Sequence, residues 1–179
     1  MVHVTQRKEN NNIIVAISVE LMSPADWPAV REIYAEGIAG GNATFETSVP
    51  DWESWTASKR ADCRLVARHD GEVVGFAVLS PISKRAVYAG VAEVTVYVAS
   101  KAQGAGIGSK LLGALVEASE KAGVWTLTAS IFPENEASLH IHRKHGFQTL
   151  GRRIRIAQLR DKWRDTILME RRSHRVDWE

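Results

Sequence analysis

The sequence predicts an α/β fold, a mixed sheet with helices on both faces, and three observations support this prediction. Apolar runs of strand length are interspersed with segments whose apolar residues recur at helical spacing. A glycine-rich loop at 103–109 separates a strand-like run from an amphipathic segment. No repeat, low-complexity tract or linker divides the 179 residues, a length typical of one domain. The predicted element order is β-α-α-β-β-β-α-β-α-β-β.

The elements of the first half begin and end at typical boundary residues. Ser23 and Pro24 start the first helix, because a serine oxygen can cap free N–H groups and proline suits a first turn. Asp51 caps a second, short helix in the same way. Asp70-Gly71 predicts a hairpin turn. The elements predicted here are a strand over 13–22, a helix over 24–38, a short helix holding Trp52 and Trp55, and strands over 64–68 and 73–79.

The second half is built around a central strand. An irregular link precedes this strand, and Ala122-Gly123 closes the helix that follows the glycine-rich loop. The predicted segments are a link over 80–90, a strand over 91–98, a helix to about 121, a strand over 127–132, a helix from 133–136 to Gly146, and two strands over 147–172 around a turn near Asp161. These elements form a single domain over 13–172. Residues 1–12 are expected to be a flexible N-terminal tail, and residues 173–179 a C-terminal tail.

Composition limits the classes of function. With 23 basic and 21 acidic residues, the net charge of +2 is too balanced to favour nucleic acid as a partner. The one cysteine, Cys63, excludes an intramolecular disulfide and is typical of a reducing compartment. The longest early apolar run, Ile13–Ile17, is too short for a signal peptide or a membrane span. We therefore expect a soluble, cytoplasmic protein with no membrane partner.

The glycine-rich loop consists of Gln103, Gly104, Ala105, Gly106, Ile107, Gly108 and Ser109. Alternate glycines let backbone N–H groups turn toward one point, and the start of a helix adds positive potential there. We therefore expect it to bind an anion, most simply a phosphate. The loop does not fit a P-loop, which ends in Gly-Lys-Ser/Thr, because here the order is Gly108-Ser109-Lys110. It does not fit a dinucleotide fingerprint either, because its third glycine comes one residue too early. A glycine-rich turn without a ligand is the remaining alternative.

These features together resemble the GCN5-related N-acetyltransferase (GNAT) superfamily over residues 17–172. The loop fits that family's pyrophosphate loop, Arg/Gln-x-x-Gly-x-Gly/Ala, at every defined position. The segment N-E-A-S-L-H-I-H-R-K-H-G-F at 135–147 resembles the family's N-x-x-A-x-x-L-Y-x-K-x-G-F. The phosphinothricin N-acetyltransferase branch is the closer match. Its marks are Ala-Thr-Phe-Glu at 43–46, the strand at 91–98, Glu-Asn-Glu-Ala-Ser at 134–138 and Trp-Arg-Asp at 163–165.

The resemblance implies acetyl-CoA as co-substrate. It also implies that a bulge splays the central strand from its neighbour, which leaves backbone groups of Val96, Tyr97 and Val98 free to pair with the pantetheine arm. The pyrophosphate would lie on the glycine-rich loop, and Asn135 would contact the cofactor. A plain helix N-cap is the alternative role for Asn135, and both roles can hold.

Glu93 is the predicted general base. It shares one face of the central strand with Thr95 and Tyr97, and a carboxylate in a strand covered on both faces is costly unless it is paired or functional. In the phosphinothricin branch the matching glutamate is the proposed base, acting directly or through water. A structural ion pair with an arginine is the alternative. A strand N–H near Val96 or Tyr97 is expected to polarise the thioester carbonyl.

His142 stands where the wider family usually has a tyrosine that acts as the general acid. A histidine at this position departs from the wider family and agrees with the closer branch. It can protonate the leaving thiolate or only fill space, and both possibilities stay open. Among the three histidines of this segment only His142 and His145 are helical neighbours, so we expect no metal site. Cys63 has no adjacent base, so direct transfer in a ternary complex is preferred to an acyl-enzyme.

The predicted acceptor is a small amino acid of the phosphinothricin, methionine sulfoximine or methionine sulfone type. Lys84 and Arg85 precede the central strand, where many branch members carry arginines and an aromatic, and Tyr88 follows; these residues are expected to bind the acidic group. Phe45 and Glu46 are expected to line the pocket. Core packing is the alternative for Phe45, and a solvated turn is the alternative for Lys84 and Arg85.

Two other functions remain open at this point. One is acetylation of a peptide or protein N-terminus, which needs an open groove. The other is a non-catalytic acetyl-CoA-binding module, which would bind without transfer. The resemblance also implies a homodimer, for which Trp163, Trp178 and the arginine-rich C-terminal end are candidate interface residues.

Overall fold

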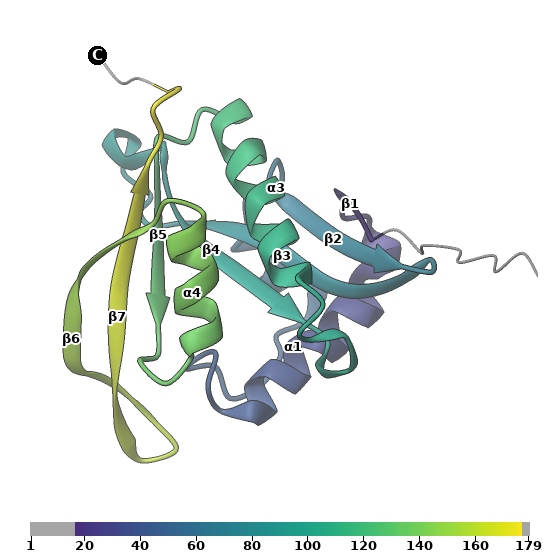
Figure 1. Ribbon diagram of the computed structural model, residues 1–179, viewed down its shortest axis with the longest axis horizontal. Helices are drawn as coiled ribbons and strands as arrows, with labels where there is room; N and C mark the ends of the chain where they lie inside the picture. Colours follow the sequence, from purple (N-terminus) through teal and green to yellow (C-terminus); the bar gives the residue numbers. More distant parts are fainter. Residues whose placement is uncertain (1–16, 177–179) are drawn as a thin grey trace, which may run out of the picture.

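The computed structural model describes residues 17–176 and has the predicted order of strands and α-helices (Figure 1). One seven-stranded sheet has the order β1-β2-β3-β4-β5-β7-β6, so the α/β fold class is confirmed. The strands are β1 (Ser18–Leu21), β2 (Arg64–His69), β3 (Glu72–Pro81), β4 (Val91–Val98), β5 (Thr126–Ile131), β6 (Gln148–Leu159) and β7 (Lys162–Arg172). The helices are α1 (Trp27–Gly40), α2 (Trp52–Ala57), α3 (Ile107–Lys121) and α4 (Glu136–Lys144), with short 3-10 helices at Pro24–Asp26, Ala86–Tyr88 and Ser100–Ala102.

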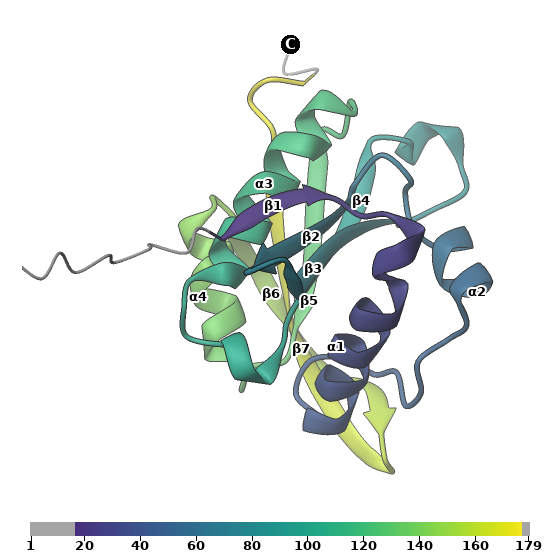
Figure 2. The same cartoon turned by 90° about the vertical axis from the view of Figure 1, so that its right-hand side faces the viewer.

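The sheet is covered on both faces. Figure 2 shows α1 and α2 on one side and α3 and α4 on the other. The first face buries a cluster around Trp55, Phe76 and Tyr97, and the opposite face buries one around Leu111 and Leu139. Since β3 lies between these clusters, its residues from Val74 to Leu79 are buried without alternation. This explains why the central strands read as continuous apolar runs.

β4 and β5 are the only parallel neighbours among the described strands, and they pair only at their beginnings. The register joins Val91 to Thr126, Ala92 to Leu127 and Glu93 to Thr128, and no further pair follows. Beyond Glu93, β5 stays paired with β7 and β4 with β3, and the two arrows diverge in Figure 1. The backbone of β4 from Val94 to Val98 therefore has no strand partner on the β5 side.

The central strand is splayed as expected, but the bulge that the resemblance implies does not appear in the pairing of β3 with β4. Their register runs from Gly75–Val98 to Pro81–Ala92 without a shift. β4 thus keeps its alternation: Tyr97 packs with the α1 face, and Val94 with the opposite face. The strands separate because β5 diverges, not because β4 carries an extra residue.

The ends of the elements differ in detail from the prediction. The first strand is Ser18–Leu21, and residues 13–16 of its predicted range lie outside the described residues, as do the N-terminal tail and Trp178. A 3-10 turn precedes α1, and the Asp26 carboxylate accepts a hydrogen bond from the Ser23 N–H at 2.8 Å across this turn. Ser173, in the expected C-terminal tail, is buried and donates its N–H to the Trp125 carbonyl at 2.8 Å.

Close approach of α1 to β4 depends on one glycine. A Cβ built on Gly37 would lie 2.3 Å from Cε1 of Tyr97. The Tyr97 ring in turn lies 5.1 Å from Tyr34 and 5.3 Å from Phe76, centroid to centroid. The aromatic layer under α1 therefore requires a residue without a side chain at position 37.

Candidate active site

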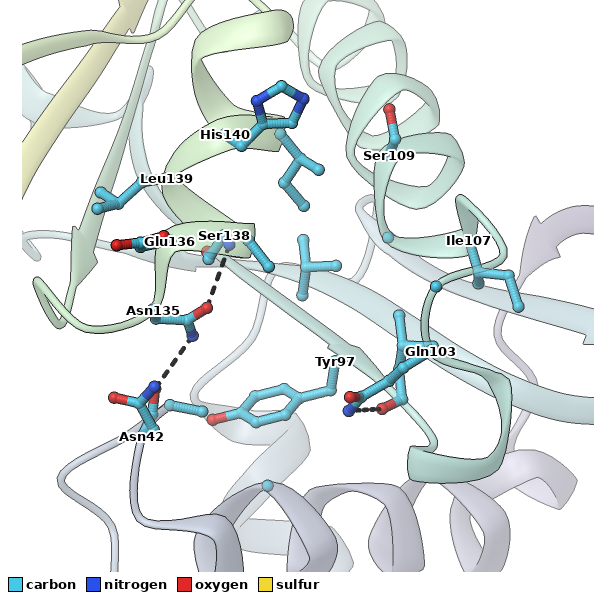
Figure 3. Close-up of a pocket in the computed structure, with 18 of the residues that line it drawn as sticks. Asn42, Tyr97, Gln103, Ile107, Ser109, Asn135, Glu136, Ser138, Leu139 and His140 are labelled. Atoms are coloured by element: carbon cyan, nitrogen blue, oxygen red, sulfur yellow. Dashed lines mark hydrogen bonds between the residues drawn. The ribbon is translucent and has the colours of Figure 1, made fainter.

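The glycine-rich loop forms part of a large cavity of about 1120 Å³ (Figure 3). We call this the loop cavity. Its lining from the loop and from β4 consists of Gln103, Gly104, Gly106, Ile107, Gly108, Ser109, Val96, Tyr97 and Val98, and α1 and α4 supply most of the remaining lining residues. Ala105 belongs to the loop but does not line the cavity. The structure thus brings nearly all predicted cofactor residues together.

The backbone of the loop is shaped for an anion. Gly104 and Gly106 have φ values of 81° and 76°, in the left-handed region that favours glycine. A Cβ on either would meet nothing within 4 Å. Gly106 precedes α3, and no side chain among the described residues caps the first turn of that helix. Its free N–H groups and positive helix end therefore suit a pyrophosphate.

A second, smaller cavity of about 320 Å³ contains both predicted catalytic residues. We call it the Glu93 cavity. Its lining includes Phe45, Glu46, Lys59, Ser80, Glu93, Thr95, Phe132 and His142. Ala43, Val96, Tyr97, Asn135 and Ser138 line both cavities. The two cavities therefore meet beside the part of β4 that has no partner from β5.

Glu93 is half-buried and faces into this cavity between two neighbouring strands. Its register partners are Ser80 on β3 and Thr128 on β5. Within the described part of the chain, no lysine or arginine lies within 4.0 Å of its carboxylate. The structural ion pair considered as an alternative role is thus not present among these residues.

His142 is buried at 4% exposure, with one ring nitrogen bonded and the other free. Nδ1 lies 2.8 Å from the carbonyl oxygen of Ser138, so Nδ1 carries a proton and donates. Nε2 is buried without a hydrogen-bond partner in the described structure. Burial lowers the pKa of His142, and the nearby charge of His145 lowers it further, while the hydrogen bond to the Ser138 carbonyl opposes this by raising it. The ring is therefore neutral at pH 7, with a lone pair on Nε2.

Asn135 connects the two cavities to the loop that follows α1. Its Oδ1 accepts from the Ser138 N–H at 3.1 Å, which makes it the N-cap of α4. Its Nδ2 donates to the Asn42 carbonyl at 3.0 Å (Figure 3). The N-cap alternative therefore holds, and the same side chain also lines both cavities.

The predicted acceptor residues separate into two groups. Phe45 and Glu46 line the Glu93 cavity, and Phe45 also packs edge-on against Phe132 with ring centroids 4.9 Å apart. Lys84, Arg85 and Tyr88 are exposed and line neither cavity. The Arg85 guanidinium lies over the Tyr88 ring, 5.5 Å from its centroid.

Two residues that the sequence did not single out line the Glu93 cavity. Lys59, just after α2, donates from Nζ to Ser80 Oγ at 2.9 Å. Burial lowers the pKa of Lys59, while the charges of Glu93 and Glu46 oppose this shift. No sequence motif indicates that Lys59 and Ser80 are site residues, because they come together only when the segment after α2 packs beside β3.

Cys63 lies apart from this chemistry. Its side chain is completely buried, and it lines neither cavity. Burial, together with the charge of Asp62, raises the pKa of the thiol to about 12. A buried, protonated thiol is a poor nucleophile, since the thiolate is the reactive form.

Residues 17–176 contain neither an arranged group of metal ligands nor a helix able to span a membrane. No group of three or more histidine, cysteine, aspartate or glutamate side chains there is arranged to hold a metal ion. None of the helices in this range is both long enough and apolar enough to span a membrane.

Comparison with known proteins places these features in a family. Residues 27–147 match the model of the acetyltransferase (GNAT) family. The chain is 34% identical to a phosphinothricin N-acetyltransferase from Alcaligenes faecalis over 167 residues, 87% of this chain and 82% of that protein.

Two solved structures agree with this assignment. A ribosomal-protein-alanine N-acetyltransferase from Brucella melitensis has a TM-score of 0.81 at 32% identity, with 87% of this chain and 99% of that chain covered. A GNAT phosphinothricin acetyltransferase from Sinorhizobium meliloti, in complex with acetyl-CoA, has a TM-score of 0.81 at 26% identity, with 91% of each chain covered. The chain therefore belongs to the GNAT family, and it is an acetyltransferase with acetyl-CoA as its co-substrate.

Proposed function

We propose that the enzyme transfers the acetyl group to the amine of a small free amino acid of the phosphinothricin, methionine sulfoximine or methionine sulfone type. The observation that carries the proposal is the Glu93 cavity, which is small, meets the loop cavity and presents a carboxylate that has no ion pair with any residue from 17 to 176. The name of the Alcaligenes relative supports the acceptor type. The acceptor and the thioester would meet where the cavities join, and transfer would be direct.

The cofactor would be held by backbone groups. The loop from Gln103 to Ser109 would bind its pyrophosphate, and Val96, Tyr97 and Val98 would pair with its pantetheine arm through groups left free by β5. Acetyl-CoA supplies the activated acetyl group. A β4 N–H near Val96 or Tyr97 would polarise the thioester carbonyl, since a donor held in place costs no reorganisation during reaction. Asn135 would contact the cofactor from α4.

Glu93 would act as the general base. An ammonium has no lone pair, so the acceptor must lose a proton before it attacks. A carboxylate that has no lysine or arginine of the described chain within 4.0 Å can accept that proton directly or through water. The nitrogen then bonds to the acetyl carbon as the carbon–sulfur bond breaks.

The His142 ring is better placed to accept a hydrogen bond or a proton at Nε2 than to donate one. Its Nδ1 proton is already committed to the Ser138 carbonyl, and its free Nε2 has a lone pair. We therefore propose that His142 orients the amine, or a water between the amine and Glu93. The leaving thiolate would then be stabilised by other groups or protonated from solvent.

The acceptor would lie against Phe45 and Glu46. Binding by Lys84, Arg85 and Tyr88 stays a prediction, and the lining of the cavities gives it no support.

The test is acetylation of an amine panel, followed by the Glu93→Gln variant. We expect wild-type enzyme to release CoA with one of these amino acids. Glu93→Gln should lower kcat at least about a hundredfold at neutral pH, because general-base catalysis contributes about 10²–10⁴-fold. Affinity for acetyl-CoA should not change, as measured by calorimetry. Glu53→Gln is the matched control, because Glu53 is exposed on α2 and lines neither cavity.

Two outcomes would contradict this assignment. No turnover of any amino acid in a broad amine panel would remove the proposed acceptor class. Unchanged turnover by Glu93→Gln would remove Glu93 from the role of base.

A second acceptor class is favoured by one observation. The Brucella structure is named for acetylation of a ribosomal-protein alanine. Mass spectrometry of peptides with an N-terminal alanine, incubated with enzyme and acetyl-CoA, would show whether this chain shares that acceptor.

A homodimer and a cytoplasmic location also stay proposals. Leu150, Ile154 and Trp163 are exposed on the β6–β7 hairpin, which supports an interface there.

A further inference from the structure

Within residues 17–176, one positively charged side chain lines the Glu93 cavity. Among its described lining residues, Lys59 is the only lysine or arginine. The Lys59 side chain is half-buried, and its Nζ donates to Ser80 Oγ at 2.9 Å. This hydroxyl fixes the direction in which the ammonium enters the cavity.

Lys59 is held beside the proposed base without contacting it. Ser80 and Glu93 are register partners on β3 and β4, so their side chains are neighbours on one face of the sheet. An ammonium bonded to Ser80 is therefore on the same side of the sheet as the Glu93 carboxylate, and the charge of Glu93 acts on the pKa of Lys59. Yet no ion pair within 4.0 Å joins Lys59 to any described carboxylate. The Lys59 ammonium and the Glu93 carboxylate therefore share one side of the cavity without forming an ion pair.

The ammonium also has donors that no residue of the described part of the chain accepts. A lysine ammonium has three N–H donors, and Ser80 accepts one of them. Trp55 and Phe76 also line this cavity, but among the described residues no aromatic ring lies in cation–π contact with Lys59. An anion from the acceptor would give this ammonium its missing partner.

We propose that Lys59 binds the α-carboxylate of the acceptor, so that the cavity selects free α-amino acids. The inference rests on the proposed function. In an α-amino acid the ammonium and the carboxylate are attached to the same carbon. Glu93 and Lys59 offer the complementary charges at adjacent positions. A peptide N-terminus has an amide in place of this carboxylate, and a simple amine has nothing there, so both lose the Lys59 contact.

Another role for Lys59 is distinguishable from this one. Its charge could act on Glu93 alone and adjust how readily that carboxylate accepts a proton. Such an effect would change kcat for every acceptor alike. Binding of the α-carboxylate instead changes KM for the free acid and leaves a neutral analogue unaffected.

The experiment compares L-methionine sulfone with its α-carboxamide, each across the same set of variants. Lys59→Met should raise KM for the free acid at least about tenfold, as expected for loss of a charge-assisted hydrogen bond in a partly buried site. Its kcat with the acid, and both constants with the carboxamide, should stay within about twofold of wild type. Lys59→Arg keeps the positive charge and should restore part of the affinity.

The controls separate this role from disturbance of the fold. Lys121→Met removes an exposed lysine at the end of α3 and should leave both substrates unaffected. Calorimetric acetyl-CoA affinity should be the same for all variants. The inference is overturned if Lys59→Met changes the acid and the carboxamide equally. It is also overturned if the double variant Lys84→Met/Arg85→Met, and not Lys59→Met, raises KM selectively for the acid.

Binding without turnover distinguishes failure of this inference from failure of the proposed function. Calorimetry of L-methionine sulfone added to enzyme with CoA should show weaker binding by Lys59→Met than by wild type. Equal binding would overturn the role of Lys59 while wild-type turnover still supports the proposed function. Weaker binding in the variant, with no turnover of any amino acid by wild type, would support Lys59 and overturn the function. No binding to wild type would overturn the inference.

Discussion

At the scale of single residues, the site contains polar groups that lack their usual ion-pair or hydrogen-bond partners among the described residues. Glu93 has no ion pair among the described residues, and Nε2 of His142 has no hydrogen-bond partner there. Leaving a buried polar atom unpaired costs stability, of the order of 1–3 kcal/mol per group. Such a cost is commonly found at functional sites, where the missing partner is the substrate.

The neutral state of His142 predicts how stability depends on pH. Its folded-state pKa lies below the usual histidine value, so the unfolded chain binds this proton more readily. The free energy of unfolding should therefore be constant above about pH 6.5 and fall as pH drops from there through the folded-state pKa. Burial lowers the pKa of His145 too, so that residue adds a loss of the same sign.

Denaturant unfolding of wild type and His142→Phe between pH 7.5 and about pH 5 measures this effect. The aromatic replacement keeps a ring against Phe147, whose centroid lies 4.9 Å from that of His142. The variant should lose less stability than wild type over this range. Equal losses in the two proteins would contradict a buried neutral imidazole.

At the scale of elements, the position of α1 is set by its contact with β4. Gly37→Ala would place a methyl group against the Tyr97 ring, and the packed aromatic layer has little room to move. We expect a loss of about 1–3 kcal/mol in the free energy of unfolding, despite the better helix propensity of alanine.

Gly40→Ala on the same helix is the matched control for this change. A Cβ at position 40 meets nothing within 4 Å, so this variant should gain about 0.4–1 kcal/mol from reduced freedom of the unfolded chain. Urea unfolding of both variants gives the comparison. Equal effects of the two substitutions would show that the Gly37–Tyr97 contact does not constrain the helix.

Elements were more predictable from the sequence than their long-range contacts. The central strand was predicted at 91–98 and is found at Val91–Val98, because its apolar run and the glycines after it are local signals. Divergence of β5 from β4 has no local signal, since it follows from the pairing of β5 with β7. The same holds for Lys59, which reaches a strand 21 residues further along the chain.

At the scale of the whole molecule, the loop cavity is lined by elements from both faces of the sheet, which pack into two different hydrophobic cores. Its lining comes from α1 on one face of the sheet and from α3 and α4 on the other, with β4 between them. A ligand there contacts both layers, and binding to the folded state alone stabilises the whole domain. Acetyl-CoA at a hundred times its Kd should add about 2.7 kcal/mol to the free energy of unfolding.

Gly106→Ala tests whether this linkage depends on the shape of the loop. The left-handed backbone at Gly106 costs any other residue about 1–2 kcal/mol, so the variant loop should leave its binding conformation and raise the Kd for acetyl-CoA about tenfold. The rise in Tm caused by a fixed acetyl-CoA concentration, measured by scanning calorimetry, should shrink accordingly.

Gly123→Ala is the control for backbone strain alone. Gly123 has a φ of 73°, lies beyond the other end of α3, and lines neither cavity. This variant should lower Tm without changing the rise caused by acetyl-CoA. A normal rise in Gly106→Ala would show that the glycine conformation does not set affinity.

Burial of Cys63 has a practical consequence at the bench. A thiol with no exposed surface and a pKa of about 12 is almost entirely protonated and shielded, so it does not reduce a disulfide dye while the chain stays folded. Each acetyl transfer releases one CoA thiol, so such a dye can record turnover continuously without background from the enzyme. With one cysteine in the sequence, the same dye would count unfolded chains, one mole of colour for each mole of protein.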